Sequence, residues 1–376
     1  MSDIAANFKA PEHIFTPKPS REPPANTTGL VGWLRESLFS SVFNAVLTIV
    51  AGVLIYFIIT GLFRWAILNA DIAGSGPEAC TSGGACWTFV KVRFSQFIYG
   101  FYPEELRWRP NLMVVIGVLP LFYALTENVP YKKWVALYLI FVFPVVAYFL
   151  LLGGSFGLEH VETSKWGGFL LTLVIAAVGI VTSLPIGICL ALGRRSNMPV
   201  VRMLCIGFIE LIRAVPLITI LFMSLVVLPL FLPPGSNFDQ LLRSLIGVSL
   251  FSSAYMAEVV RGGLQAIPKG QYEAADAMGL RYWASMRLII LPQALKIVIP
   301  AIVSSFIGLF KDTTLVLIIG LTDFLAMIQL AVTDAKWQKY ITEGYVFCAV
   351  LFFICCFGMS RYSMYLERKL ETGHRR

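Results

Sequence analysis

The sequence predicts an all-α polytopic membrane protein with about eight transmembrane helices. Of its 376 residues, 57% are hydrophobic and only 14% are charged, and the mean hydropathy is +0.75, far from the composition of a soluble globular chain. Apolar runs also recur along the chain, and a helix needs roughly 20 such residues to cross a hydrocarbon layer. The candidate runs are Val42 to Trp65, Leu112 to Leu125, Trp134 to Leu152, Phe169 to Leu192, Leu204 to Leu230, Leu242 to Val260, Ile297 to Gly320 and Tyr345 to Met359.

Residues 1–41 form a polar, proline-rich segment that contains FTPKPSREPP and lacks the apolar core of a signal peptide. We therefore expect a flexible cytoplasmic tail. The tail ends in GLVGWLRESLFS, which predicts either an interfacial helix or simply the start of the first span. The residues that share a helical face there are Leu30, Trp33, Leu34, Leu38 and Phe39.

Residues 42–160 are expected to hold additional N-terminal transmembrane helices and a long periplasmic insertion, at about residues 67–110. The insertion contains Cys80 and Cys86, whereas the other cysteines lie in or beside apolar runs. In an oxidising compartment Cys80 and Cys86 can form a disulfide, and the alternative is two free thiols in a mobile loop. The cysteines and the three scattered histidines show no metal-ligand spacing, so no metal site is expected.

Basic residues are distributed unevenly between the predicted loops. If the loop around Gly270 is cytoplasmic, alternation of the spans places both termini, the turn at Asn128 to Lys133 and the loop at Arg194 to Arg202 on the same side. Most Lys and Arg residues fall in these segments, which is the positive-inside pattern. The net charge of +8 then follows from topology, and no clustered patch indicates nucleic-acid binding.

The segment GQYEAADAMGLRYWASMRLIILPQA, from Gly270 to Ala294, has the features of a docking loop. It predicts a short helix with a small-residue face, a glycine break, a second amphipathic piece and a proline stop. Small side chains let a partner surface approach closely, and aromatic side chains are enriched at binding hot spots. The residues expected to make this contact are Glu273, Ala274, Ala275, Gly279 and Pro292, with Tyr272 and Trp283 as anchors.

The spacing of EAA, then G, then ILP in this segment resembles the cytoplasmic coupling loop of bacterial ABC importer permeases. Four further stretches of the C-terminal half resemble the polar amino-acid subfamily of these permeases: WGGFLLTLVIAAVGIVTSLPIGICLALGRRS, ELIRAVPLITILF, SAYMAEVVRGGLQAIPKGQYEAA and LFKDTTLVLIIG. The second usually reads ELIRGTPLL, and here Ala214 and Val215 replace the glycine and threonine. The insertion and the extra N-terminal spans resemble the general L-amino-acid branch.

The resemblance implies a five-helix type I importer core over residues 161–365, with the coupling loop at residues 263–295 and a basic cytoplasmic tail at residues 366–376. It also implies two separate ABC ATPase subunits, a periplasmic amino-acid binding protein, and a second permease chain that is related but not identical. The chain has no GxxxxGK[ST] motif, so ATP and Mg²⁺ are expected on the ATPase subunits and no cofactor on this chain. Since GxSxG and HExxH are absent too, a translocation subunit is expected and not an enzyme.

Two adjacent charges, Lys311 and Asp312, lie well inside the apolar run that begins at Ile297. Each charge costs on the order of 3 kcal/mol in hydrocarbon, so charged residues in a span are candidates for function. A zwitterionic amino acid offers its carboxylate to the lysine and its ammonium group to the acidic residues. The candidate substrate-binding residues are Lys311, Asp312, Thr313, Thr314 and Glu258.

The alternative for Lys311 and Asp312 is a structural ion pair with Glu210 or Arg213 of other spans. Successive helix positions diverge by about 100°, so both charges can face one small cavity only if the helix is locally unwound. Likewise Glu273 either orients a coupling helix in a cleft of the ATPase or is a solvated loop carboxylate.

The sequence as a whole predicts the permease subunit of an ATP-driven importer that moves polar or general L-amino acids across the bacterial inner membrane by alternating access. An ATP-independent secondary transporter is the first alternative, and it requires inverted repeats and proton-relay carboxylates. A structural membrane anchor is the second, and it has no need of charges inside a span.

Overall fold

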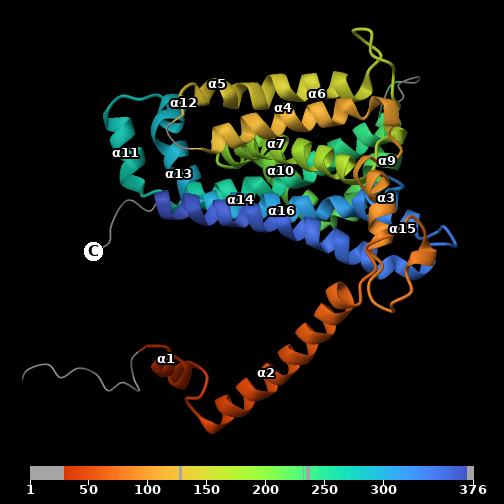
Figure 1. Ribbon diagram of the computed structural model, residues 1–376. Helices are drawn as coiled ribbons and strands as arrows, with labels where there is room; N and C mark the ends of the chain where they lie inside the picture. Colours follow the sequence, from red (N-terminus) through yellow and green to blue (C-terminus); the bar gives the residue numbers. More distant parts are fainter. Residues whose placement is uncertain (1–28, 127–128, 232, 234–237, 371–376) are drawn as a thin grey trace, which may run out of the picture. The chain divides into compact units, whose positions relative to one another are not determined.

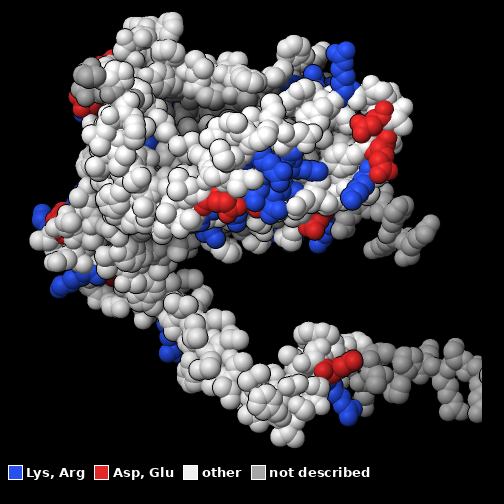
Figure 2. All heavy atoms as spheres, turned by 180° about the vertical axis from the view of Figure 1, so that it is seen from behind, with Lys and Arg blue, Asp and Glu red and all other residues white. Residues whose placement is uncertain are grey.

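The structure is a computed structural model, and it describes residues 29–126, 129–231, 233 and 238–370. These residues are helical and form no β-strand beyond isolated bridges. The chain divides into two compact units, Met1–Ala70 and Asp71–Arg376. Figure 1 traces the helices, and Figure 2 shows that the visible surface is mostly uncharged, with Lys, Arg, Asp and Glu gathered in a few groups.

The described part of the first unit contains two helices, α1 (Gly29–Ser37) and α2 (Val42–Phe63), and α2 continues into a π-helical turn, η2 (Arg64–Leu68). Ser41 caps α2, because its hydroxyl accepts a hydrogen bond from the backbone N–H of Asn44 (3.1 Å). Of the two alternatives that the sequence left open, the structure therefore has a separate helix before the first span. Within α2 no residue is buried.

The second unit contains the remaining helices, and its long helices lie mainly along one common axis in Figure 1. Its α-helices are α3 (Trp87–Tyr99), α4 (Trp108–Leu125), α5 (Lys132–Leu137), α6 (Phe143–Leu152), α7 (Gly168–Arg194), α8 (Pro199–Ala214), α9 (Leu217–Val226), α10 (Gln240–Ala266), α11 (Lys269–Ala277), α12 (Tyr282–Ser285), α13 (Leu291–Ile297), α14 (Ile299–Asp312), α15 (Phe324–Ala331) and α16 (Ile341–Leu370). Short π and 3₁₀ segments are η3 (Pro77–Ala79), η4 (Glu104–Leu106), η5 (Tyr138–Val142), η6 (Thr163–Lys165), η7 (Leu228–Phe231), η8 (Met286–Ile290), η9 (Thr313–Ile319) and η10 (Gln338–Tyr340).

Six helices in the described residues are long and apolar enough to cross a membrane, or seven if one bent pair counts as a span. The six are Val42–Leu68, Glu104–Leu125, Lys132–Leu152, Gly168–Arg194, Ile299–Ile319 and Gln338–Leu370. Two of the expected eight runs are not among the six. One is the bent pair α8 and α9, and the other is α10, which is 27 residues long but carries several serines and charged residues. The expected end of the core at residue 365 falls inside α16.

The expected span from Leu204 to Leu230 is not a single straight helix. The structure has two helices there, α8 and α9, which are bent by 108° at the break between them. Pro216 supplies the physical reason: it has no N–H to donate, and its ring disfavours a helical conformation for the preceding residue. Val215 is accordingly extended, with φ −118° and ψ 148°.

Close packing of α7 against α10 and α14 forms the centre of the second unit. A Cβ on Gly187 would lie 2.8 Å from the Met256 side chain, and a Cβ on Gly179 would lie 2.8 Å from Leu309 and 3.1 Å from Val248. Both glycines therefore allow an approach that no larger residue permits. These contacts fix α10 beside α7 along most of its length.

The two ends of the second unit differ in structure. One end carries α11 and α12, and we call it the α11 end; the other carries α3 and α15, with α3 crossing the direction of the long helices (Figure 1). At the α3 end, the guanidinium of Arg93 pairs with Asp334 (2.6 Å), and Phe89 packs on Trp337 with ring centroids 5.4 Å apart. The insertion between the first two spans is thus attached to the C-terminal helices.

Cys80 and Cys86 are bonded to each other in this insertion, with their Cα atoms 5.5 Å apart. The backbone N–H of Cys86 donates to the buried carboxylate of Glu343 on α16 (3.1 Å). The hydroxyl and N–H of Ser82 donate to Asp71 (2.7 and 3.1 Å), and these bonds hold the pKa of the Asp71 carboxyl below its usual value. The residues between the two cysteines therefore form an ordered turn.

Candidate coupling site and translocation path

The predicted docking segment is an exposed helix with a glycine stop. α10 ends at Ala266, because Pro268 holds Ile267 in an extended conformation, and α11 begins at Lys269. α11 ends where Gly279 takes a φ of +72°, a left-handed conformation that favours glycine. The carbonyls released there accept bonds from the N–H groups of Met278 (to Ala274, 3.1 Å), Gly279 (to Asp276, 2.9 Å) and Leu280 (to Ala275, 3.1 Å).

The predicted contact residues divide between two faces of this segment. Glu273, Ala274, Gly279 and Pro292 are exposed, as a docking role requires. Ala275 is fully buried, because this side of α11 packs against η8. Ala275 therefore lets α11 approach its own chain closely, and it is not part of the exposed surface.

Large exposed apolar side chains lie at the end of α11 and in the two segments that follow it, α12 and η8. Trp283, which the sequence predicts as an anchor, is 70% exposed, and Met278 and Leu288 are 73% and 66% exposed. Sequence reasoning missed Met278 and Leu288, although two apolar side chains in a polar loop were a usable signal. We call these three residues the apolar part of the candidate docking surface, because exposed apolar side chains of this kind mark contacts with other proteins.

Tyr272 has a different place from the one expected. Its hydroxyl donates to the carbonyl of Leu264 (3.1 Å) and accepts from the guanidinium of Arg195 (3.0 Å), which also lies over the ring, 5.4 Å from its centroid. Tyr272 is thus a tether between α11 and the ends of α10 and α7. Burial raises the pKa of the neighbouring Tyr282 phenol, while the charge of Arg195 opposes this shift.

A surface hollow of about 440 Å³ lies between α11 and the end of α10. It is lined by Arg195, Leu264, Gln265, Ile267, Lys269, Tyr272, Glu273 and Asp276. Charged side chains of both signs line this hollow together with the aliphatic side chains of Leu264 and Ile267. Such charged groups can form ion pairs with a partner at the rim of an interface.

Glu258 lies in a cluster of charges at the α11 end, and not beside Lys311. Its carboxylate pairs with Arg194 (2.8 Å), Arg261 (2.7 Å) and Arg213 (3.5 Å). Val248 and Leu309 both lie against Gly179 and so mark one level of the bundle. From that level Glu258 lies about 15 Å further along α10, at about 1.5 Å per residue. The structure therefore does not bring Glu258 together with the other candidate substrate residues.

The other four candidates lie where α14 gives way to the 3₁₀ segment η9. Lys311 is exposed, Asp312 is half-buried and ends α14, and Thr313 is buried. The hydroxyls of Thr313 and Thr314 donate to backbone carbonyls, of Phe310 (2.8 Å) and Lys311 (2.9 Å). Lys311 and Asp312 are the last two residues of α14, and the change from α-helical to 3₁₀ geometry begins at the next residue, Thr313.

Neither Lys311 nor Asp312 belongs to an ion pair among the residues that the structure describes. The alternative of a structural pair with Glu210 or Arg213 is not what the structure has, since Glu210 pairs with Arg194 (3.0 Å) and Arg213 with Glu258. The opposite charges of these adjacent residues attract each other, but neither pairs with a third charged group in the described residues. Ionisable residues inside a span usually face a water-filled cavity, a ligand or another chain and not lipid.

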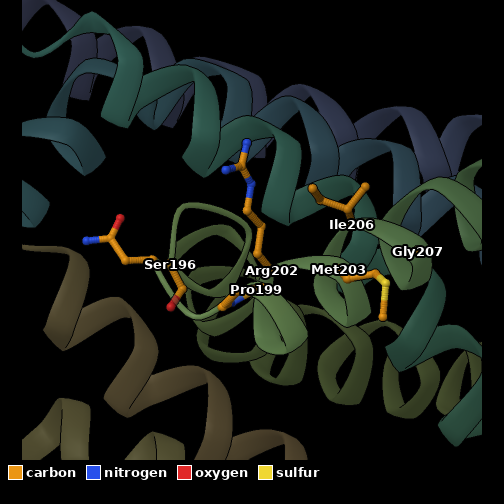
Figure 3. Close-up of a pocket in the computed structure, with 7 residues that line it drawn as sticks. Ser196, Pro199, Arg202, Met203, Ile206 and Gly207 are labelled. Atoms are coloured by element: carbon orange, nitrogen blue, oxygen red, sulfur yellow. The ribbon is translucent and has the colours of Figure 1, made fainter.

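A second surface hollow, of about 570 Å³, lies where α7 turns into α8 (Figure 3). It is lined by Ser196, Asn197, Pro199, Arg202, Met203, Ile206 and Gly207. These residues offer one cation and no carboxylate, and they do not form a set of nucleophile, base and acid. Within the described ranges there is also no group of three or more His, Cys, Asp or Glu side chains that could hold a metal ion.

Known proteins resemble the chain over nearly its whole length. Residues 183–372 match the family described as binding-protein-dependent transport system inner membrane component. The chain is 51% identical over 361 residues to the inner membrane amino-acid ABC transporter permease protein YhdY of Escherichia coli (strain K12), with 96% of this chain and 98% of that protein covered.

It is also 41% identical over 434 aligned residues to the glutamate/glutamine/aspartate/asparagine transport system permease protein BztC of Rhodobacter capsulatus, with 96% of this chain and 98% of that protein covered. A solved structure, the crystal structure of an amino acid ABC transporter with histidines, is 28% identical, with a TM-score of 0.48, and covers 54% of this chain and 92% of its own. The match of residues 183–372 contains the whole docking segment as well as the Glu258 cluster and Lys311. The chain belongs to the family of inner membrane components of binding-protein-dependent transport systems.

Proposed function

We propose that this chain is the permease subunit of an ATP-driven ABC importer that moves polar or general L-amino acids across the bacterial inner membrane by alternating access. The observation that carries the proposal is the 51% identity, over 96% of the chain, to an amino-acid ABC transporter permease. The relative from Rhodobacter capsulatus is named for glutamate, glutamine, aspartate and asparagine, which supports an amino acid with a polar side chain as the substrate.

The exposed α11 segment is the part of the chain that an ATPase subunit contacts in this proposal. Its apolar residues Met278, Trp283 and Leu288 provide buried area, and Glu273 at the rim provides charge. ATP and Mg²⁺ are bound by two such ATPase subunits, and this chain holds no cofactor. The α11 end then faces the cytoplasm, and the α3 end receives the periplasmic binding protein. Both termini of the chain are assigned to the cytoplasmic side of the membrane.

Lys311 and Asp312 are the residues that we assign to the substrate, with Thr313 and Thr314 beside them. The lysine ammonium pairs with the substrate carboxylate, and the aspartate pairs with the substrate ammonium. Their lack of an ion pair within the described residues and the change of helix type at Thr313 support this assignment. The second permease of the complex is a related, non-identical chain that encloses the site from the other side.

The rival proposal is a secondary transporter that works without ATPases. That proposal gives no role to the exposed α11 segment and its apolar side chains, whereas in the importer this segment contacts the ATPase subunit. A membrane anchor likewise leaves the charges at Lys311 and Asp312 unexplained.

The test is uptake by the purified complex. The tagged chain is isolated from native membranes with its co-purifying subunits and reconstituted into proteoliposomes with ATP inside or outside. The importer proposal expects uptake of radiolabelled glutamate or glutamine only with ATP on the α11 side and only with the binding protein on the opposite side. Uptake that needs a proton or sodium gradient and no ATP would refute it.

A further inference from the structure

Five charged side chains from three helices meet at the α11 end of the bundle. They are Arg194 at the end of α7, Glu210 and Arg213 on α8, and Glu258 and Arg261 on α10. Glu258 is the centre of this group, and its side chain is only 15% exposed. One carboxylate oxygen bonds Arg194 at 2.8 Å, and the other bonds the Nη2 and Nε atoms of Arg261 at 2.7 and 3.0 Å.

This cluster is a strong constraint on helix positions. A partly buried carboxylate is stable only while its charge is compensated, and bidentate arginine pairs also fix geometry. Without the carboxylate of Glu258, three guanidinium groups would lie close together with only Glu210 to offset them. The three helices are therefore held together as long as the carboxylate stays in place, and they can separate only by exchanging its partners.

The neighbouring arginine connects this cluster to α11. Arg195 follows Arg194 directly, and its guanidinium donates to the Tyr272 hydroxyl (3.0 Å) and to the carbonyl of Leu264 (3.1 Å). Tyr272 is the residue of α11 that forms these hydrogen bonds with the ends of α7 and α10. The end of α7 thus contacts α11 through Arg195, and it contacts α8 and α10 through Arg194. A shift of α11 therefore acts on Arg195 and, through the backbone, on Arg194.

The cluster also has a route toward the span that carries Lys311. Arg213 lies one turn before the break at Val215 and Pro216, where α8 and α9 are bent by 108°. On the far side of this break α9 packs against η9, which begins at Thr313. Contacts and chain connections therefore link α11, Arg195, Arg194, Glu258, α8, α9 and η9 in an unbroken series. Packed side chains and ion-pair networks of this kind can carry coupling between distant sites.

We propose that Glu258 is a positioning residue, which transmits displacement of α11 to α8, α9 and η9 through its ion pairs with Arg194, Arg213 and Arg261. The inference rests on the proposed function, since it requires an ATPase that displaces α11. It assigns Glu258 to coupling and not to the substrate.

The test measures coupling and binding separately in the reconstituted complex. For wild type, Glu258→Gln and Glu258→Asp, the molecules transported per ATP hydrolysed and the apparent substrate affinity are compared. Glu258→Gln is expected to lower the transport ratio at least about fivefold, the low end of typical coupling between sites, while ATP hydrolysis and apparent affinity stay close to wild type. Glu258→Asp keeps the charge and is expected to retain most of the ratio. Glu105→Gln, on the exposed turn η4, is the control for loss of a carboxylate.

Arg195→Gln keeps the proposal testable if Glu258→Gln does not assemble, because it cuts the contact with Tyr272 and leaves the ion pairs of Glu258 intact. It is expected to lower the same ratio. An unchanged ratio in Glu258→Gln, or in Arg195→Gln when Glu258→Gln cannot be isolated, overturns the inference. A loss of apparent affinity at unchanged ratio also overturns it, since Glu258 would then contact the substrate. A wild-type complex that takes up no amino acid with ATP refutes the proposed function itself.

Discussion

Substitution of Gly279 isolates the backbone turn that ends α11. A Cβ at this position meets nothing within 4 Å, so a new side chain causes no clash, and the effect comes from the φ of +72° alone. Holding an alanine in the left-handed region costs roughly 1–2 kcal/mol. That amounts to about a 5- to 30-fold decrease in the equilibrium ratio of the native turn to other conformations.

Asparagine and proline set the two limits of this series. Asparagine visits the left-handed region more readily than other residues, so Gly279→Asn is expected to be close to wild type. Proline is locked near a φ of −65°, so Gly279→Pro cannot form the turn, and it also loses the N–H that bonds the carbonyl of Asp276 at 2.9 Å. The expected order of coupling is therefore Gly, Asn, Ala and Pro, from highest to lowest.

The assay is the ratio of substrate transported to ATP hydrolysed in proteoliposomes, with the amount of inserted chain measured for each variant. Gly279→Pro should insert normally and lose coupled transport. Wild-type coupling in Gly279→Pro would show that the turn has no part in the transmission of movement, and the reasoning from its geometry would be refuted.

Three further predictions concern packing, the substrate and the insertion. Gly263→Ala should lower the thermal unfolding midpoint in detergent, because its Cβ would lie 2.6 Å from the carbonyl oxygen of Ala294 and overpacking of this kind costs about 1–3 kcal/mol. Gly262→Ala is the matched control, since its Cβ meets nothing within 4 Å, and equal midpoints for the two variants would contradict the packing. Lys311→Met and Asp312→Asn should each weaken the apparent substrate affinity about tenfold or more, as loss of a charge-assisted hydrogen bond does. Lys339→Met is the control, and unaltered affinity in both test variants would exclude a substrate role. The double variant Cys80→Ser with Cys86→Ser should lower the free energy of unfolding by about 2 kcal/mol, since the disulfide closes a short loop. In wild type, Cys80 and Cys86 should resist alkylation until a reductant is added, and labelling without reductant would show that they are free thiols.

Local backbone requirements were readable from the sequence. The glycine break at Gly279 follows from a short polar helix that ends near the residue type best suited to a positive φ, and the structure has this turn. The break at Pro216 had an equally clear local signal. It was missed because the residues on both sides of the break are apolar enough to belong to one span, and hydropathy does not report a change in the direction of the helix axis.

The orientation of single side chains depended on residues far away in the sequence. Tyr272 points inward because Arg195 and Leu264 offer it hydrogen-bond partners, and Ala275 is buried because η8 packs on it. Of the arginines that bind Glu258, Arg261 is within one turn on the same helix, whereas Arg194 comes from α7. Amphipathic spacing within one segment carries no information on such partners, so residue types were predictable and their pairing was not.

The measurement that tests the central claim most directly is co-purification from native membranes. The chain is tagged and extracted in mild detergent as wild type and as Met278→Asp with Trp283→Asp, which places two charges on the apolar part of the docking surface. The account predicts that an ABC ATPase and a second permease co-purify with wild type, and that only the ATPase is lost from the double variant. Recovery of the wild-type chain alone, still able to move amino acids in vesicles without ATP, would contradict it.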